Sequence, residues 1–381
     1  MRELLSELSD WHAAGTPFAL ATVVAVRGSA PRAPGAVMAV NATGTVAGSV
    51  SGGCVESDVY EAATETLATG ETQLRTYGIS EDEAFGAGLT CGGTIDVLVQ
   101  PYVAAADRDM LRELAATIAA GEPVALATVV SGAAPRGARR LVLAGRTSGS
   151  LGDEGLDAAV TDDARGLLAQ GTTGSGRYGP HGERRMQDVT VFVQTYAPAP
   201  RMLVFGAIDH AAATARIGSF LGYRVTVCDA RPAFATRERF PTADEVVRAW
   251  PHTYLESTPV DARTVVCVLT HDPKFDVPLL AAALRTPAAY IGVMGSRRTH
   301  ADRIARLRAA GVDEAGLARL ASPVGLDLGA RTPEETAVSI AAEIIQHRWG
   351  GTGRPLKEMT GTIHHGPQFG DRPDGGPGAA S

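Results

Sequence analysis

Residues Arg201–Arg231 read RMLVFGAIDHAAATARIGSFLGYRVTVCDAR. An apolar run ends at Gly206, a stretch with helical periodicity follows, and a second apolar run ends at the acid Asp229. A strand, a helix and a second strand in this order form the opening unit of a dinucleotide-binding parallel sheet. The pattern predicts an α/β domain of the Rossmann-like type over residues 198–360, beginning at the proline-rich hinge Pro198–Pro200.

The phosphate-binding turn of this unit departs from the usual glycine pattern. Gly206 and Asp229 stand where the first glycine and the ribose-binding acid belong, but Ile208 replaces the glycine that lets the backbone approach a pyrophosphate. Gly295 and Ser296, at the start of a later helix, are a second candidate anion site. The sequence therefore predicts the fold and makes a bound NAD(P) or FAD doubtful.

Further along, an apolar strand ends at His271 and Asp272, where loops at the carboxyl ends of parallel strands carry function. His271 is a candidate general base, with Asp272 beside it. A hydrogen-bonded loop histidine is the simpler alternative. Glycine and proline dominate residues 361–381, which predicts a disordered tail.

Upstream of the hinge, residues 1–197 contain one pattern twice, over about 1–103 and 104–197. FALATVVAVRGSAPR at Phe18–Arg32 returns as VALATVVSGAAPR at Val124–Arg136, and IDVLVQPY returns as DVTVFVQTY. The order of elements is preserved while the offset drifts, as changes in loop length produce. The repetition predicts a duplicated α+β domain whose copies pack as pseudo-symmetric halves.

The two copies differ at two places that carry cysteine. Copy one has GSVSGGCVE at Gly48–Glu56 where copy two has GSLGDEGLD, and it has GLTCGGTIDV at Gly88–Val97 where copy two has GERRMQDV. A glycine pair needed only for a turn should matter to both copies. The joint loss favours one binding site built around Cys54 and Cys91. The alternative is that both are buried fillers and that copy two diverged.

Glycine-rich turns before a helix bind anions through successive backbone N–H groups. Ser51, Gly52 and Gly53 are therefore candidate phosphate-binding residues. Arg27 and Arg32 are candidate clamps for a phosphate or carboxylate, although copy two also keeps an Ala-Pro-Arg sequence. Two thiols alone make a poor closed zinc site. They could instead ligate a soft metal, carry a persulfide or form a transient disulfide.

The composition of the 381-residue chain limits its partners. Its net charge of −7 argues against a broad nucleic-acid-binding face. No apolar run approaches the roughly 20 residues of a membrane span, and the first residues lack the apolar core of a signal peptide. We therefore expect a cytoplasmic protein without a membrane span.

Seven motifs in this order resemble the xanthine dehydrogenase accessory factor (XdhC/CoxI) family over about residues 1–350. They are GSAPRAPGAVMAV, GSVSGGCVE, GLTCGGTIDVLVQP, YRVTVCDARPAFATRERFP, THD, GVMGSRR and GLDLGARTPEETAVSIAAEI. The resemblance implies a cysteine-bearing N-terminal domain, a C-terminal Rossmann domain, and an accessory factor more than a catalyst. It implies molybdenum cofactor (molybdopterin) as cargo, held near Cys54 and Cys91, which would ligate the molybdenum or shield its sulfido group. Ser51, Gly52 and Gly53 would hold the phosphate, with Gly92, Gly93, Arg27 and Arg32 nearby.

The resemblance also implies partners. The client would be the apo-enzyme of a molybdenum hydroxylase of the xanthine or carbon monoxide dehydrogenase type. A cysteine desulfurase and a homodimer are further expectations. Two alternatives remain open at this point: an NAD(P)- or FAD-dependent oxidoreductase, and a thiol or persulfide carrier without metal.

Overall fold

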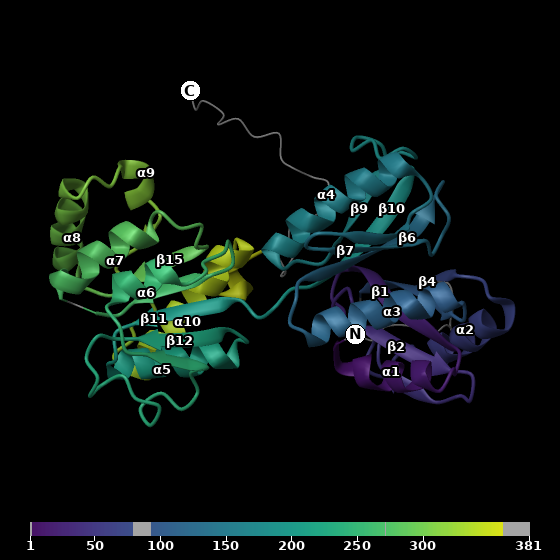
Figure 1. Ribbon diagram of the computed structural model, residues 1–381, viewed down its shortest axis with the longest axis horizontal. Helices are drawn as coiled ribbons and strands as arrows, with labels where there is room; N and C mark the ends of the chain where they lie inside the picture. Colours follow the sequence, from purple (N-terminus) through teal and green to yellow (C-terminus); the bar gives the residue numbers. More distant parts are fainter. Residues whose placement is uncertain (1, 79–92, 271, 361–381) are drawn as a thin grey trace. The chain divides into compact units, whose positions relative to one another are not determined.

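The computed structural model describes residues 2–78, 93–270 and 272–360. The chain divides into two compact units between Pro198 and Ala199, and Figure 1 shows each unit with its own sheets and helices. The 361–381 segment lies outside the described residues, so the prediction of a disordered tail is not tested.

The first repeat forms a five-stranded antiparallel sheet, sheet A, in the order β3-β2-β1-β5-β4. Its strands are β1 (Phe18–Arg27), β2 (Val37–Asn41), β3 (Val46–Gly48), β4 (Gln73–Tyr77) and β5 (Thr94–Tyr102). The helix α2 (Glu56–Thr69) connects β3 with β4 and ends at Gly70, whose φ of 75° suits a residue without a side chain.

The second repeat forms sheet B, with the matching strand order β8-β7-β6-β10-β9. Its strands are β6 (Val124–Gly132), β7 (Arg139–Leu143), β8 (Thr147–Ser150), β9 (Gly174–Tyr178) and β10 (Val189–Tyr196). The connecting helix α4 (Glu154–Gln170) ends at Gly171 with φ 66°, as α2 ends at Gly70. Equal strand order and equal helix placement show that the N-terminal unit is a duplicated α+β domain, as the sequence predicted.

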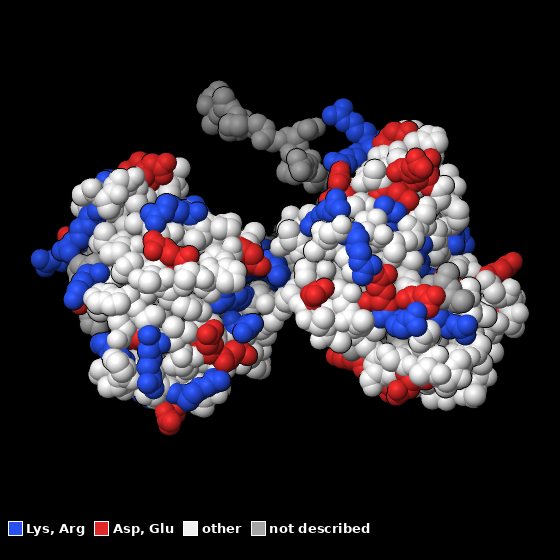
Figure 2. All heavy atoms as spheres, in the orientation of Figure 1, with Lys and Arg blue, Asp and Glu red and all other residues white. Residues whose placement is uncertain are grey.

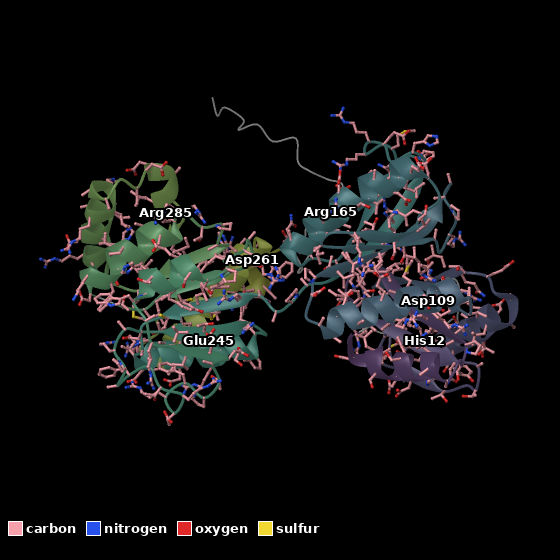
Figure 3. All side chains as sticks on the ribbon, viewed as in Figure 1. His12, Asp109, Arg165, Glu245, Asp261 and Arg285 are labelled. Carbon is pink, nitrogen blue, oxygen red and sulfur yellow. The ribbon has the colours of Figure 1, made fainter. Side chains whose placement is uncertain are left out.

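The two sheets pack face to face. One apolar cluster combines residues of both sheets, including Phe18, Leu20, Leu126 and Leu141, and Figure 3 shows side chains filling this region. Outside the sheets, α2 covers sheet A and α4 covers sheet B. The further helices of this unit, which add leucines to the shared cluster, are η1 (Arg2–Leu4), α1 (Leu5–Ala13) and α3 (Ala105–Ala119). The N-terminal unit is thus a sandwich of helix, sheet, sheet and helix.

The C-terminal unit contains a six-stranded parallel sheet in the order β13-β12-β11-β14-β15-β16. In chain order this is 3-2-1-4-5-6, the order of doubly wound dinucleotide-binding folds. The strands are β11 (Arg201–Phe205), β12 (Arg224–Cys228), β13 (Glu245–Val247), β14 (Val265–Val268), β15 (Tyr290–Val293) and β16 (Leu320–Ala321). The Rossmann-like expectation is therefore confirmed.

Helices cover both faces of this sheet. One face packs against α5 (Asp209–Phe220) and α10 (Pro333–Trp349). The other packs against a second set of helices: α6 (Pro251–Ser257), α7 (Pro273–Ala283), α8 (Arg297–Ala309) and α9 (Glu314–Leu317). A short turn of 3-10 helix, η2 (Leu356–Glu358), follows α10. Covering both faces explains why β14 is apolar throughout and β11 is apolar after its first residue, Arg201.

Positive and negative side chains are interspersed on the face that Figure 2 shows. No large patch of one sign is visible there, which agrees with the modest net charge of the sequence.

Candidate functional site

The loops that carry the predicted site all lie at one end of sheet A, where its strands begin or end. β1, β3 and β4 finish at this end of the sheet, and β2 and β5 begin there. The pairing of Arg27 with Thr94 and of Met38 with Gly48 shows this arrangement. Three segments therefore leave the sheet at the same end: the loop after β1, the loop after β3 and the connection between β4 and β5. These three segments carry Arg32, Cys54 and Cys91, respectively.

Cys91 and Gly92 lie outside the described residues, so whether Cys91 meets Cys54 is not tested. The described residues that flank the β4–β5 connection lie close together at this end of the sheet, because a Cβ added to Gly78 would be 2.6 Å from Oγ1 of Thr94. Cys54 is partly buried against the core cluster under α2, and Val26 and Ala30 pack against that cluster as well. The loop between β3 and α2, residues 49–55, is called the Cys54 loop. This loop and the loop after β1 thus cover a common apolar core.

The loop before α2 is folded around the carboxylate of Glu56. The backbone N–H groups of Ser51, Gly52 and Gly53 donate to it over 2.9, 2.9 and 2.8 Å. The Ser49 hydroxyl donates over 2.6 Å, and the Ser51 hydroxyl donates as well. Burial alone would raise the pKa of Glu56, but these hydrogen bonds lower it to about 2.

This arrangement changes the expected role of the glycine-rich turn. The sequence predicted that Ser51, Gly52 and Gly53 offer their N–H groups to a phosphate, but the structure gives those donors to Glu56. A phosphate could reach them only by displacing an ionised carboxylate. Sequence reasoning missed Glu56, although an acid three residues after a Gly-Gly pair at a helix start is a signal for such a contact.

The equivalent carboxylate of the second repeat, Asp157, is held differently. It accepts one loop N–H, from Leu151 over 2.7 Å, and pairs with the Arg140 guanidinium over 3.1 Å. Strand pairing places Met38 of the first repeat where the second repeat has Arg140. Glu56 is therefore held by amides and hydroxyls in a place where its counterpart has a cation.

Gly93 has a steric explanation. A Cβ at this position would lie 2.1 Å from the Ser29 carbonyl oxygen, so no other residue fits. In the second repeat the glycine stands on the opposite strand, where a Cβ at Gly132 would lie 1.9 Å from the Asp188 carbonyl oxygen. Both repeats need a close approach here, so the absence of Gly93 from copy two is not by itself a sign of function, contrary to the sequence argument.

The two candidate arginines differ in their contacts. The Arg27 guanidinium makes two hydrogen bonds to Asp96, over 2.8 and 2.9 Å, and this contact raises the pKa of Arg27. Arg32 is exposed in the loop after β1. Arg27 is therefore already neutralised by a carboxylate, whereas Arg32 faces solvent.

The remaining cysteines are core residues. Cys228 and Cys267 are buried at the centre of the parallel sheet, with 1% and 0% of their surface exposed. Burial raises the pKa of each thiol to about 12. Neither thiol is available as a nucleophile or a metal ligand at neutral pH.

A cavity of about 160 Å³ lies in the Rossmann-like unit, lined by Gly206, Ile208, Asp229 and Thr270 among others. Asp229 accepts hydrogen bonds from the Ala207 N–H over 2.8 Å and from the Arg231 side chain over 3.0 and 2.8 Å. Burial would raise the pKa of Asp229, but these bonds lower it.

These contacts do not fit a bound dinucleotide. Both oxygens of Asp229, which stands at the position of a ribose-binding acid, are engaged within the chain, and the Ile208 side chain does not cap α5. Asp209 adds a negative charge in the first turn of that helix, where a pyrophosphate would bind. We therefore assign no chemical step to a nucleotide.

The other predicted residues of this unit have structural contacts. Asp272 caps α7 by accepting the Lys274 N–H over 3.0 Å, and His271 lies outside the described residues. Ser296 caps α8 by accepting the Thr299 N–H over 3.1 Å, beside Gly295. Within the described ranges, no group of three or more His, Cys, Asp or Glu side chains could hold a metal ion. No described helix is long and apolar enough to cross a membrane.

Family models match both units of the chain. The XdhC and CoxI family model matches residues 11–78 and 117–179, and the XdhC Rossmann domain model matches residues 202–344. A Bacillus subtilis protein whose name describes it as a probable subunit of xanthine dehydrogenase is 32% identical over 331 residues, covering 86% of this chain and 92% of that protein. The chain belongs to the XdhC and CoxI family.

Two further relatives share nearly the whole length of this XdhC and CoxI family chain. The Escherichia coli protein named "Molybdenum cofactor insertion chaperone PaoD" is 26% identical, covering 86% of this chain and 83% of that protein. A Bacillus halodurans crystal structure, described as a xanthine dehydrogenase, is 26% identical with a TM-score of 0.63, covering 94% of this chain and 98% of that chain.

Proposed function

We propose that this protein binds molybdenum cofactor and delivers it to the apo-enzyme of a molybdenum hydroxylase. The relatives named as an insertion chaperone and as part of a xanthine dehydrogenase support this function. The observation that carries this proposal is the Cys54 loop, whose conformation is fixed by hydrogen bonds to Glu56. The loop lies at the end of sheet A from which the connection that carries Cys91 also leaves. The corresponding loop of the second repeat has no cysteine.

The thiols and the guanidinium at this end of sheet A suit the chemistry of the cargo. Molybdenum bound by a dithiolene is a soft metal centre, and thiolates are soft ligands. Cys54 and Cys91 would ligate the metal or shield its sulfido group. Arg32 supplies an exposed guanidinium for the phosphate of the pterin. In this proposal Ser51, Gly52 and Gly53 shape the loop, because their N–H groups are held by Glu56.

The protein acts in this proposal as a carrier and not as a catalyst. Its own residues hold the cofactor, exclude water from the labile ligand and release the cargo to the client. A cysteine desulfurase as the source of sulfur and a homodimeric state remain predictions of the family resemblance, and a cytoplasmic location remains a prediction from the sequence.

Anaerobic purification followed by metal and pterin analysis tests the proposal. We expect molybdenum and pterin to copurify with the wild-type protein in equal amounts, and both to be lost from Cys54→Ala. Cys228→Ala removes a thiol that is buried elsewhere and should retain the cargo. Wild-type protein without pterin, or a Cys54→Ala protein with a full load, would contradict the proposal. A persulfide on Cys54 without any pterin would instead favour the thiol carrier.

A further inference from the structure

The Cys54 loop has an unusual number of donors aimed at one carboxylate. Four backbone N–H groups, from Ser51, Gly52, Gly53 and Val55, donate to Glu56 together with two serine hydroxyls. Three of these backbone donors precede Cys54 in the chain and the fourth follows it. The carboxylate thus ties together the residues on both sides of the cysteine.

The backbone of the loop is matched to this purpose. Gly52 and Gly53 have φ angles of +79° and +122°, which residues with side chains rarely adopt. A Cβ on either glycine would meet no atom within 4 Å, so the backbone angle alone requires glycine. The Cys54 N–H donates to the Ser51 hydroxyl over 3.0 Å, and that hydroxyl donates in turn to Glu56. Glu56 therefore reaches Cys54 through one intervening side chain.

Capping of a helix explains only part of this network. In the second repeat, α4 is capped by Asp153, which accepts the Leu156 N–H over 3.0 Å. Asp157, the counterpart of Glu56, receives one loop N–H and a guanidinium. The second helix start therefore divides its donors between two carboxylates, Asp153 and Asp157, whereas the loop that carries Cys54 directs its donors to Glu56.

We infer that Glu56 is the positioning residue for Cys54, holding the loop in the one conformation that presents the thiol to the cargo. This inference rests on the proposed function for the identity of the cargo, but not for the contact between Glu56 and the loop. Glu56 acts through Ser51 and the backbone and itself touches no cofactor.

The experiment measures Cys54 directly. Glu56→Gln places an amide NH₂ opposite N–H donors, and Ser49→Ala removes one hydroxyl that donates to the carboxylate. The matched controls are Asp157→Asn and Ser150→Ala in the second repeat, where the Ser150 hydroxyl accepts the Gly152 N–H. The rate of iodoacetamide alkylation at Cys54 is followed by peptide mass spectrometry from pH 6 to pH 9, beside the melting temperature.

We expect Glu56→Gln to raise the Cys54 alkylation rate at pH 7 by up to about tenfold, because the loop loses the carboxylate that fastens it on both sides of the cysteine and therefore opens to the reagent more often. Ser49→Ala should shift it in the same direction by less, and Glu56→Asp should restore part of the wild-type pH profile. The two controls should leave the profile unchanged, even if they lower the melting temperature.

A Glu56→Gln or Ser49→Ala protein that melts earlier but keeps the wild-type pH profile of Cys54 alkylation would overturn the inference, because Glu56 would then serve stability alone. The failure of the proposed function looks different. In that case the alkylation profiles respond as expected, but neither the wild-type protein nor any variant binds molybdenum cofactor.

Discussion

Gln100 and Gln194 occupy equivalent positions in the two repeats, and each donates a hydrogen bond across the sandwich to a glycine carbonyl of the other repeat. Gln100 donates to Gly137 over 3.1 Å and Gln194 donates to Gly35 over 2.8 Å. Both glutamine side chains are buried, with 3% and 8% exposed. This reciprocal pair is the clearest expression of the pseudo-twofold relation between the repeats.

Replacing either glutamine by alanine should destabilise the N-terminal unit. Each change removes a hydrogen bond to a partly buried carbonyl, and such a bond contributes about 0.5–1.5 kcal/mol. Gln187→Ala, on an exposed position of the second repeat, is the matched control. Urea unfolding of the full chain measures the effect, and two buried variants that unfold like the control would show that the crossing contacts do not stabilise the sandwich.

The buried ion pair of the Rossmann-like unit should be far more sensitive than its exposed pairs. Arg303 lies 3.1 Å from Asp276, and their side chains are 3% and 5% exposed. Asp276→Asn leaves a buried guanidinium without its counter-charge, so we expect a loss of about 3–5 kcal/mol in unfolding free energy. Glu314→Gln, which breaks the exposed pair with Arg308, should cause no measurable loss. Equal losses in the two variants would contradict this account.

The lowered pKa of Glu56 makes the free energy of unfolding depend on pH in a defined way. Its pKa is lowered in the folded state from 4.5 to about 2, so its contribution is present in full above about pH 4.5 and is lost as the pH falls toward 2. The difference in stability between wild type and Glu56→Gln should therefore be constant from pH 7 to pH 5 and shrink between pH 4.5 and pH 2. Thermal unfolding at several pH values measures it, and a difference that grows toward acid pH would have the wrong sign.

The Rossmann-like unit should not bind a dinucleotide tightly. Asp229 is held by Ala207 and Arg231, and Asp209 places negative charge at the helix start. Titration with NADH, NADPH or FAD, followed by fluorescence, is expected to show no saturation at micromolar concentration. Saturable binding with turnover of a substrate would revive the oxidoreductase alternative and would require these contacts to rearrange.

The fold was largely predictable because its signals are local and repeated. The apolar run, turn and acid of Arg201–Arg231 specify a βαβ unit, and the repeated Phe18–Arg32 pattern specifies the duplication. The site was less predictable. The sequence predicted an external anion for the donors of Ser51, Gly52 and Gly53, because the position of Glu56 at the helix start does not reveal how many loop donors turn onto its carboxylate.

The glycines show the same limit. Gly93 is required by the approach of Ser29, a residue distant in the sequence, and the second repeat meets the same need with Gly132. A comparison of aligned sequences detects the missing glycine in copy two but not the replacement on the opposite strand. Steric needs of this kind become visible only when the pairing of strands is known.

Binding of molybdenum cofactor by the Cys54 loop of the first repeat is the step on which the proposed function depends. The most direct measurement is anaerobic equilibrium binding of isolated molybdenum cofactor to wild type, Cys54→Ala and the thiol control Cys228→Ala. We expect saturable binding by wild type and control with one cofactor per chain, and affinity at least tenfold weaker for Cys54→Ala, about 1.4 kcal/mol. Equal affinities for wild type and Cys54→Ala would contradict it.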